Sequence, residues 1–318
     1  MRVGCGSATI GIFAGQWLGH ADEVIVVDDA STDGTADLVA ARYGERVRLL
    51  RVQHRNAAAS RNAGVAVASS EWLLFLDADD VLDPRCLEAR LALLEREPSP
   101  RWVVNDGYVA TSEGREEGTW LAGYFEPLRE RVGDLFEPLV HRCFPLFSSA
   151  LIARDAYLAV GGMDPAMVYT HDYDLMLRLA ARDAGAILPE PLMTYRRHAQ
   201  GLSRLIEERH VEETVLMERI AAGALRPEPA LRRLGELRAS ALAFQVGIAA
   251  LRRGRVDEAR RYFARSRVSG PWPRRLLATC ACAVPAAWWP RVRRLGMLKG
   301  GVQAIRELPF AVRPRGMR

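Results

Sequence analysis

The sequence is poor in cysteine, and its cysteines follow no recognisable pattern. They are odd in number and scattered over 318 residues: Cys5, Cys86, Cys143, Cys280 and Cys282. Their spacing matches neither a zinc site nor a disulfide framework, which excludes a small disulfide-stabilised secreted domain. The N-terminus also lacks the basic segment and clean apolar run that are typical of a signal peptide. We therefore predict a reducing, cytoplasmic location.

Long hydrophobic runs are also missing. The longest, residues 276–290 (LLATCACAVPAAWWP), has 15 residues and contains Pro285, whereas a membrane-spanning helix needs about 20 apolar residues. It fits an interfacial helix and a buried helix equally well. Residues 289–318 then carry eight Lys or Arg and one acid, Glu307. This tail predicts peripheral contact with the inner face of a membrane rather than with nucleic acid, and a solvated basic tail is the alternative.

The remaining composition is that of a globular protein. Hydrophobic residues make up 49% and charged residues 26% of the sequence, and the formal net charge is +5. A chain of this length exceeds one typical domain. We predict a first domain over residues 1–200 and a helical C-terminal region over residues 201–318.

Strand and helix patterns alternate through the first 200 residues. Residues 23–28 (EVIVVD) form a continuous β-branched run, typical of a strand buried on both faces. The alternation predicts an α/β fold with a doubly wound mixed sheet. The predicted strands are 23–28, 47–52, 72–77, 102–110 and 186–198. The predicted helices are 35–44, 59–69, 83–97 and 170–185.

Two further stretches complete the predicted organisation. Residues 143–164 indicate an edge strand followed by a helix that ends at Gly161 and Gly162. From about Leu202 the pattern is helical, and residues 237–266 predict two antiparallel helices joined at Gly254. A single hairpin of this kind is not a solenoid, so we expect a helical appendage.

Acidic residues follow two of the predicted buried strands. Asp28 and Asp29 end the strand 23–28, and Asp77, Asp79 and Asp80 follow the run WLLFL. In open α/β sheets ligands bind beyond the carboxyl ends of the strands. Unpaired buried carboxylates are costly, so we expect a cation or ligand hydroxyls there. Asp-x-Asp supplies hard oxygen ligands that suit Mg²⁺ or Mn²⁺. The alternative is that these acids cap the helix 83–97, as Asp83 is expected to do.

Four segments, in this order and spacing, resemble family 2 glycosyltransferases, which are inverting enzymes of the GT-A fold. The resemblance covers roughly residues 20–200. The segments are VIVVDDASTDGT (24–35), NAAASRNAGVAVASSEWLLFLDADDVLDPRCL (56–87), GGMDPAMVYTHDYDLMLRLA (161–180) and PLMTYRRH (191–198).

The resemblance implies roles for particular residues. Asp172 matches the catalytic base, and His171 stands before it where the family usually has Glu. The expected nucleotide-binding residues are Asp28, Asp29, Arg61 and Asp77. The expected metal site consists of Asp79, Asp80 and His198. The expected donor-sugar and acceptor region consists of Gly161, Gly162 and His171.

The implied chemistry is a single in-line displacement at the anomeric carbon of a nucleotide sugar. A carboxylate takes the proton of the attacking hydroxyl, and the metal with His198 stabilises the leaving diphosphate. Uridine diphosphate is the commonest carrier in such families and is chosen on that basis. The expected acceptor is a glycan or a lipid-linked glycan of the bacterial cell envelope.

One departure from the family leaves alternatives open. The usual first strand, ending in a Pro-Thr-x-Asn-like turn, is missing or replaced by a short stub at Val3–Ser7, and residues 8–18 are predicted to be a helix. A degenerate, non-catalytic nucleotide-binding relative is therefore one alternative. A haloacid-dehalogenase-like phosphatase using DADDV (77–81) and a nucleotidyltransferase are others.

Overall fold

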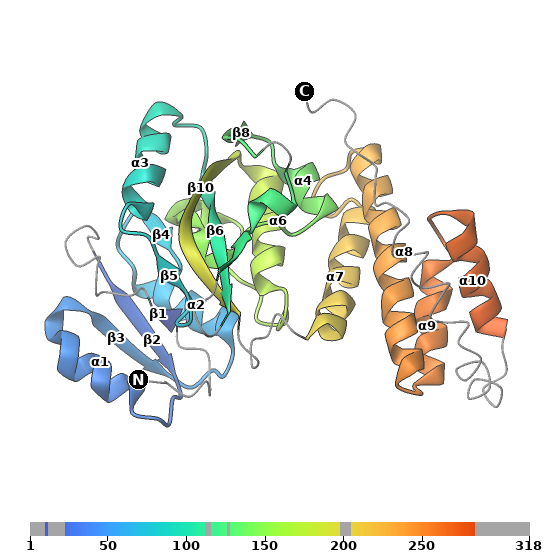
Figure 1. Ribbon diagram of the computed structural model, residues 1–318, viewed down its shortest axis with the longest axis horizontal. Helices are drawn as coiled ribbons and strands as arrows, with labels where there is room; N and C mark the ends of the chain where they lie inside the picture. Colours follow the sequence, from blue (N-terminus) through green and yellow to red (C-terminus); the bar gives the residue numbers. More distant parts are fainter. Residues whose placement is uncertain (1–9, 12–22, 112–115, 126–127, 198–204, 284–318) are drawn as a thin grey trace. The chain divides into compact units, whose positions relative to one another are not determined.

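The computed structural model of the protein is shown in Figure 1. It describes residues 10–11, 23–111, 116–125, 128–197 and 205–283. The chain divides into two compact units, Met1–Leu205 and Ile206–Arg318. The prediction that residues 1–200 and 201–318 are separate domains implies that each folds independently, and it stays a prediction.

The first unit contains a β–α–β segment near its start. Strands β2 (Ile25–Asp29) and β3 (Arg48–Val52) pair in parallel, and helix α1 (Thr35–Tyr43) connects them. Every residue of β2 is buried, as its continuous apolar run predicts. The small core of this segment consists of Val24, Val26 and Val47.

The other edge of β2 pairs with β1 (Ile10–Gly11), which runs antiparallel to it. The predicted helix over residues 8–18 is therefore wrong at residues 10 and 11. A strand at this place satisfies backbone groups of β2 that would otherwise form an open sheet edge. The predicted stub at Val3–Ser7 and the residues 12–22 lie outside the described part of the chain.

A second sheet has seven strands in the order β4-β9-β6-β10-β5, with β7 on β6 and β8 on β10. β6 and β10 run parallel, and the other pairs of this sheet are antiparallel. The predicted mixed α/β sheet is thus confirmed. The strands are β4 (Trp72–Leu74), β5 (Val81–Leu82), β6 (Trp102–Thr111), β7 (Glu116–Thr119), β8 (Arg131–Gly133), β9 (Leu151–Ala153) and β10 (Gly185–Arg197).

The strand predicted over residues 72–77 is shorter than expected. Strand β4 ends at Leu74, while Phe75 and Leu76 continue as buried residues outside β4. Their apolar character reflects core packing, which a run of this kind does not distinguish from strand pairing. Asp77 is consequently separated from the end of β4 by two buried residues.

The edge strand predicted within residues 143–164 is wrong in its position. β9 lies inside the sheet, because Ile152 pairs with Leu73 of β4 on one side and with Trp102 of β6 on the other. The β9 residues Leu151–Ala153 are all buried. A strand of three apolar residues does not reveal whether one or both of its edges are paired.

The helices predicted over residues 35–44, 59–69, 83–97 and 170–185 are present, with ends shifted by a few residues. Leu175 and Leu179 of α6 are fully buried, as the amphipathic pattern predicts. The helices are α2 (Ala57–Val67), α3 (Cys86–Arg96), α4 (Phe136–His141), α5 (Arg154–Ala159) and α6 (His171–Arg182).

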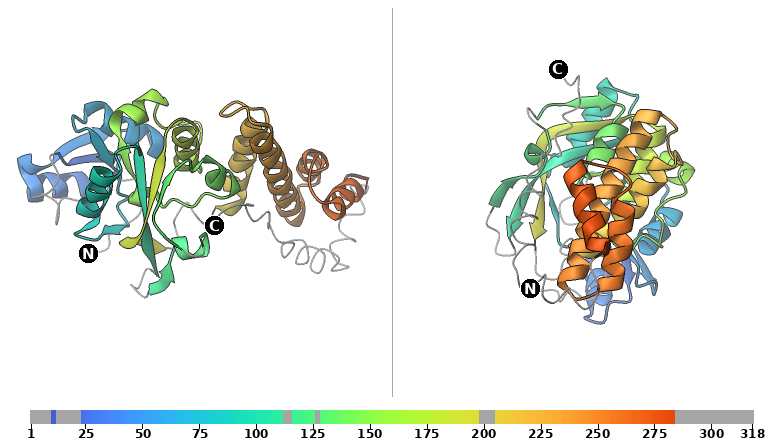
Figure 2. Two further views of the ribbon diagram at one scale, coloured as in Figure 1. Left: turned by 90° about the horizontal axis from the view of Figure 1, so that it is seen from above. Right: turned by 90° about the vertical axis from the view of Figure 1, so that its right-hand side faces the viewer.

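The second unit is helical in its described part. It consists of α7 (Ile206–Ala221), α8 (Pro229–Arg252), α9 (Val256–Ser266) and α10 (Trp272–Ala283). α8 and α9 lie side by side and are joined at Gly254, whose φ is +79° (Figure 2). The predicted helical hairpin is thus confirmed. Gly247 has no side chain, so the ring of Phe263 can pack directly against α8. A Cβ at this position would lie 2.8 Å from the ring.

α8 is long and apolar enough to cross a membrane by length and composition alone. In this unit, however, 67% of its most apolar window is buried, which is also what the central helix of a helical core shows. The apolar run 276–290 begins in α10, where Leu276 and Leu277 are exposed. Its remainder and the basic tail lie outside the described residues.

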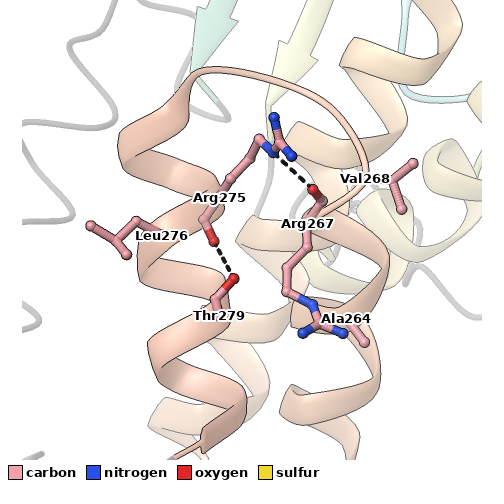
Figure 3. A pocket seen from close by; sticks show the side chains of 6 residues that line it. All are labelled: Ala264, Arg267, Val268, Arg275, Leu276 and Thr279. Atoms are coloured by element: carbon pink, nitrogen blue, oxygen red, sulfur yellow. Dashed lines mark hydrogen bonds between the residues drawn. The ribbon is translucent and has the colours of Figure 1, made fainter.

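A cleft of about 470 Å³ lies between α9 and α10 (Figure 3). Arg275 donates from Nε to the carbonyl of Arg267 at 3.1 Å. Among the described residues, neither arginine has an acidic side chain as an ion-pair partner. The cleft is lined by Ala264, Arg267, Val268, Arg275, Leu276 and Thr279.

Candidate functional site

Helix α2 organises the candidate site. Asn56 caps its N-terminus, with the side-chain oxygen accepting a hydrogen bond of 2.9 Å from the backbone of Ala59. The consecutive residues Ser60, Arg61 and Asn62 then point to different parts of the unit, because successive side chains are about 100° apart around a helix. Each of these side chains forms hydrogen bonds with a different part of the chain. The sequence alone does not show these contacts.

Ser60 reaches the end of β2. Its hydroxyl donates 2.8 Å to Asp29, and the backbone N–H groups of Arg55 and Asn56 donate 2.7 and 2.9 Å to the same carboxylate. Asp29 is fully buried. Burial acts to raise the pKa of Asp29, but the bonds from Arg55, Ser60 and Asn56 outweigh it, so the pKa lies below its usual value. Asp29 therefore anchors the start of α2 as an ionised group.

Two features around Asp29 mark this corner as unusual. The neighbouring Asp28 is 4% exposed, and its Oδ1 has no hydrogen-bond partner among the described residues. Ala30 and Arg55, with φ of 60° and 51°, are the non-glycine residues of the described part in the left-handed region. Strained backbone of this kind concentrates at ligand sites. Both features are compatible with a ligand at the ends of β2 and β3.

Arg61 is the central cation of the site and is only 6% exposed. Its Nη2 is paired with Asp77, beyond the end of β4. Its Nη1 lies 2.5 Å from Nε2 of His171, the first residue of α6. The guanidinium stacks over Phe147 at 5.1 Å, and Nε is buried without a partner among the described residues. One side chain thus joins the acids after β4 to the start of α6.

His171 is neutral in this arrangement. Arginine has only donors, so Nε2 of His171 must accept, which leaves the proton on Nδ1. Nδ1 lies 3.2 Å from the carbonyl of Val168, which accepts that proton. Burial is the largest effect on the pKa of His171 and lowers it. Asp172 raises the pKa, Arg61 lowers it by less, and Asp77 and the Val168 carbonyl raise it slightly, so that the net pKa lies below its usual value. The geometry and the electrostatics therefore agree on the Nδ1–H tautomer.

Asp77, Asp79 and Asp80 form the acidic cluster of the site. A carboxylate oxygen from each lies within 4.8 Å of the others. Asp80 is 6% exposed and accepts 2.6 Å from Ser148, whose oxygen also accepts from the backbone of Asp77 at 3.1 Å. Burial, with the charges of Asp77 and Asp79, raises the pKa of Asp80 to about 8.

This cluster fits a divalent cation. It offers three hard oxygen ligands at the spacing a small ion requires. A cation would also offset the negative charges of Asp77 and Asp79 that help to raise the pKa of Asp80. The alternative role as helix caps finds no support here, since α3 has no side-chain hydrogen bond at its N-cap. Asp83 instead accepts from the backbone of Arg85 at 2.8 Å, in the turn before α3.

Asn62 bonds the glycine loop after α5. Its side-chain oxygen accepts from the hydroxyl of Tyr157 at 2.6 Å and from the backbone of Met163 at 3.0 Å. Gly162 has a φ of +70°, and a Cβ there would lie 2.8 Å from the Asn62 oxygen. Gly161 has a φ of +85° with no atom within 4 Å of a Cβ. The loop therefore needs glycine for its backbone at both positions and for close packing only at Gly162.

Asp172 sits beside His171 at the first turn of α6. Its carboxylate accepts 2.8 Å from the backbone of Tyr173 and is partly exposed. Of the predicted residues, Arg61 thus contacts both Asp77 and His171, and Asp79 and Asp80 lie in the same cluster as Asp77. Asp28 and Asp29 connect to this group through α2 rather than directly. His198 lies outside the described residues.

Residues 15–154 match the family model for glycosyl transferase family 2. Residues 15–154 thus have the sequence of a family 2 glycosyltransferase domain. The predicted resemblance to this family is confirmed, and it favours a glycosyltransferase over the phosphatase alternative. The crystal structure of residues 1–349 of S. aureus TarS is similar, with a TM-score of 0.55 over 86% of this chain and 82% of that chain. At 17% identity this likeness concerns the fold, and the predicted GT-A fold is confirmed.

Curated relatives of this glycosyltransferase domain match over part of their length. An uncharacterized glycosyltransferase of Haemophilus influenzae is 30% identical over 49% of this chain and 51% of its own. An uncharacterized Mycobacterium tuberculosis protein is 31% identical over 60% of this chain and 54% of its own length. The succinoglycan biosynthesis protein ExoO of Rhizobium meliloti is 46% identical over 20% and 18%. The chain spans about half the length of the first two.

Several side chains of the candidate site escaped prediction. Phe147 and Ser148 lie in a stretch with no motif of its own, and Arg196 lies in the segment 191–198 without an assigned role. Only the folded chain places them beside Arg61 and Asp80. Ser60 and Asn62 flank Arg61 in the segment SRN, so their position in that motif was the available signal.

Proposed function

We propose that this domain transfers a sugar from a nucleoside diphosphate sugar to a hydroxyl group of a glycan or lipid-linked acceptor, with inversion at the anomeric carbon. The observation that carries the proposal is the Arg61 bridge. It links the acids after β4, which suit a nucleotide diphosphate and its cation, to the helix start that bears Asp172.

The nucleotide end of the donor is assigned to Asp28, Asp29, Arg61 and Asp77. The unpartnered oxygen of Asp28 suits a ligand N–H or hydroxyl donor. The buried Nε of Arg61 lacks an acceptor among the described residues, and a guanidinium suits phosphate oxygens. Uridine diphosphate is the proposed carrier.

Asp79 and Asp80, with His198, are the proposed ligands for Mg²⁺ or Mn²⁺. The three-carboxylate cluster and the raised pKa of Asp80 support this assignment. Bound there, such an ion supplies positive charge for the diphosphate that leaves. Arg61, already in contact with Asp77, supplies a second positive charge in the same place.

Asp172 is the proposed catalytic base. The bond between the anomeric carbon and the diphosphate oxygen breaks as the bond to the acceptor oxygen forms, and the acceptor proton passes to Asp172. Its partial exposure suits contact with an acceptor that arrives from solvent. The backbone of Tyr173 fixes one carboxylate oxygen at 2.8 Å and leaves the other for the proton. Gly161, Gly162 and His171 are assigned to the donor-sugar and acceptor region.

The proposed setting is the cytoplasmic side of a bacterial membrane, in cell-envelope polysaccharide synthesis. The similarity of a short segment to a succinoglycan biosynthesis protein supports the substrate class. Membrane contact is assigned to the C-terminal region. There Arg267 and Arg275 lack acidic partners among the described residues, and Val268 and Leu276 are exposed.

Two measurements on one set of variants test this function. Nucleoside diphosphates with Mn²⁺ should raise the melting temperature of the wild type, because ligands stabilise the state that binds them. Asp79→Asn should lose this shift, whereas Asp172→Asn should keep it. Incubation with nucleotide sugars and a lipid-linked acceptor pool should then release nucleoside diphosphate from the wild type but not from Asp172→Asn. Binding without release by the wild type would favour the degenerate, non-catalytic alternative.

A further inference from the structure

The pairing of Arg61 with His171 sets this chain apart from the motif it resembles. The family usually has Glu before the catalytic base, and this chain has His171. Glu and neutral His can both accept a hydrogen bond from Arg61, but only Glu remains an acceptor when the solution becomes mildly acidic.

We propose that His171 is a positioning residue that holds Arg61 in its donor-binding place only while the imidazole is neutral, which makes donor binding acid-sensitive. This inference rests on the proposed function of Arg61 as a contact of the nucleotide sugar. It adds a condition under which the site is assembled.

Arg61 has little freedom to compensate for the loss of a partner. It is 6% exposed, its Nη2 is taken by Asp77, and its face rests on Phe147 at 5.1 Å. His171 is the partner of Nη1, at 2.5 Å. Its own ring is 7% exposed and is oriented by the Val168 carbonyl. Arg61 and His171 are therefore both held in place by buried contacts rather than by solvent-exposed ones.

Protonation of His171 would remove the only lone pair that Nη1 of Arg61 uses among the described residues. It would also place a second cation against the guanidinium. The charged groups that face His171 are Arg61 from α2, Asp77 beyond β4 and Asp172 on its own helix. Arg61 opposes the imidazolium, and the two carboxylates favour it.

The consequence concerns the direction of a pH effect. Because burial keeps the pKa of His171 below its usual value, the bridge is intact at neutral pH and is lost on acidification. Without the hydrogen bond to His171, the guanidinium of Arg61 no longer keeps the orientation that is proposed for donor binding. Donor affinity should then fall by about tenfold for each pH unit below the pKa, as for any binding coupled to one proton.

The test measures the dissociation constant of the nucleoside diphosphate with Mn²⁺ by calorimetry between about pH 5 and 7.5. The affinity of the wild type should fall as the pH drops through the pKa of His171. The fall should be smaller in His171→Glu, which keeps only the pH dependence that the diphosphate and Asp80 contribute to both proteins. His171→Ala should bind at least about tenfold more weakly than the wild type at pH 7.5. His210→Gln, a histidine change in the helical unit, is the matched control and should keep the wild-type profile.

Parallel pH profiles for wild type and His171→Glu would overturn the inference, and so would wild-type affinity in His171→Ala. A ligand-free measurement separates this failure from failure of the proposed function. Nitrogen NMR of the imidazole should report the Nδ1–H tautomer of His171 at neutral pH. An Nε2–H tautomer would overturn the inference even if nucleotides bind, whereas Nδ1–H with no nucleotide binding at any pH would count against the proposed function alone.

Discussion

The hydroxyl of Ser60 donates a hydrogen bond of 2.8 Å to the carboxylate of Asp29. The next residue in α2, Arg61, contacts Asp77. β2 and β4, which precede these two acids, belong to separate hydrogen-bonded sheets in the described part of the chain. Two adjacent side chains of one helix therefore connect the acidic residues that follow two different sheets. Backbone pairing between strands does not connect these sheets in the described part of the chain.

Replacing Asp29 by Asn should destabilise the protein. An amide has one oxygen, so it cannot accept all the bonds from Arg55, Asn56 and Ser60. The expected loss is about 1–3 kcal/mol in the free energy of unfolding, measured by urea denaturation at neutral pH. Asp37→Asn, at an exposed position of α1, is the matched control and should change stability by less than about 0.5 kcal/mol.

Asp29 also predicts a direction for acid sensitivity. Its pKa is lowered in the folded protein, so its stabilising contribution is complete above the usual value of 3.8 and disappears as the pH falls through the folded value. The stability difference between wild type and Asp29→Asn should therefore shrink below about pH 4. A difference that stays constant down to pH 2 would contradict the assigned bonding.

Asp80 predicts the opposite pH dependence in metal-free solution. With its pKa at about 8 when folded and 3.8 when unfolded, the folded state retains a proton that the unfolded state releases between these values. The free energy of unfolding should therefore decrease as the pH rises from about 4 to 8, by at most about 1.4 kcal/mol per pH unit from this group. Urea denaturation in EDTA should show this slope reduced in Asp80→Asn. Adding Mn²⁺ should reduce the wild-type slope, and an identical slope in both proteins would exclude Asp80 as its source.

The glycine loop offers a pair of substitutions that share a left-handed backbone and differ in the contacts of the added methyl group. Gly161→Ala adds a methyl group into open space, so it costs only the left-handed backbone strain, about 1 kcal/mol. Gly162→Ala has a similar strain and also brings its Cβ within 2.8 Å of the Asn62 oxygen. It should lose about 1–3 kcal/mol more. Thermal unfolding of both proteins gives the comparison, and equal losses would show that Asn62 yields without cost.

Membrane contact can be tested on the described part of the helical unit. Arg267→Glu combined with Arg275→Glu should weaken sedimentation with anionic phosphatidylglycerol vesicles by at least about tenfold, since each basic residue near such a surface contributes about 1 kcal/mol. The charge-matched control, Arg42→Glu with Arg46→Glu, changes exposed positions of the first unit and should bind like the wild type. Unchanged binding of the first variant would assign any membrane contact to other residues.

Periodicity and turn chemistry were enough to predict most elements of the fold. The buried run before Asp28, the helices α1, α2, α3 and α6, and the hairpin at Gly254 lie close to their predicted places. These features depend on neighbours in sequence, where side-chain spacing carries the information. The short β4 and the internal position of β9 were mispredicted, because pairing partners are set by segments far away in the chain.

The sequence by itself determined the resemblance to family 2 glycosyltransferases, the acidic turn Asp77–Asp80 and the residue types available at the site, because these follow from local spacing and motif order. Only the tertiary structure decided that His171, 110 residues from Arg61, accepts its hydrogen bond. It also decided that Asp80 carries a raised pKa. The physical reason is that the burial and the hydrogen-bond partners of a side chain depend on how segments far apart in the sequence pack. Local sequence patterns do not specify this packing.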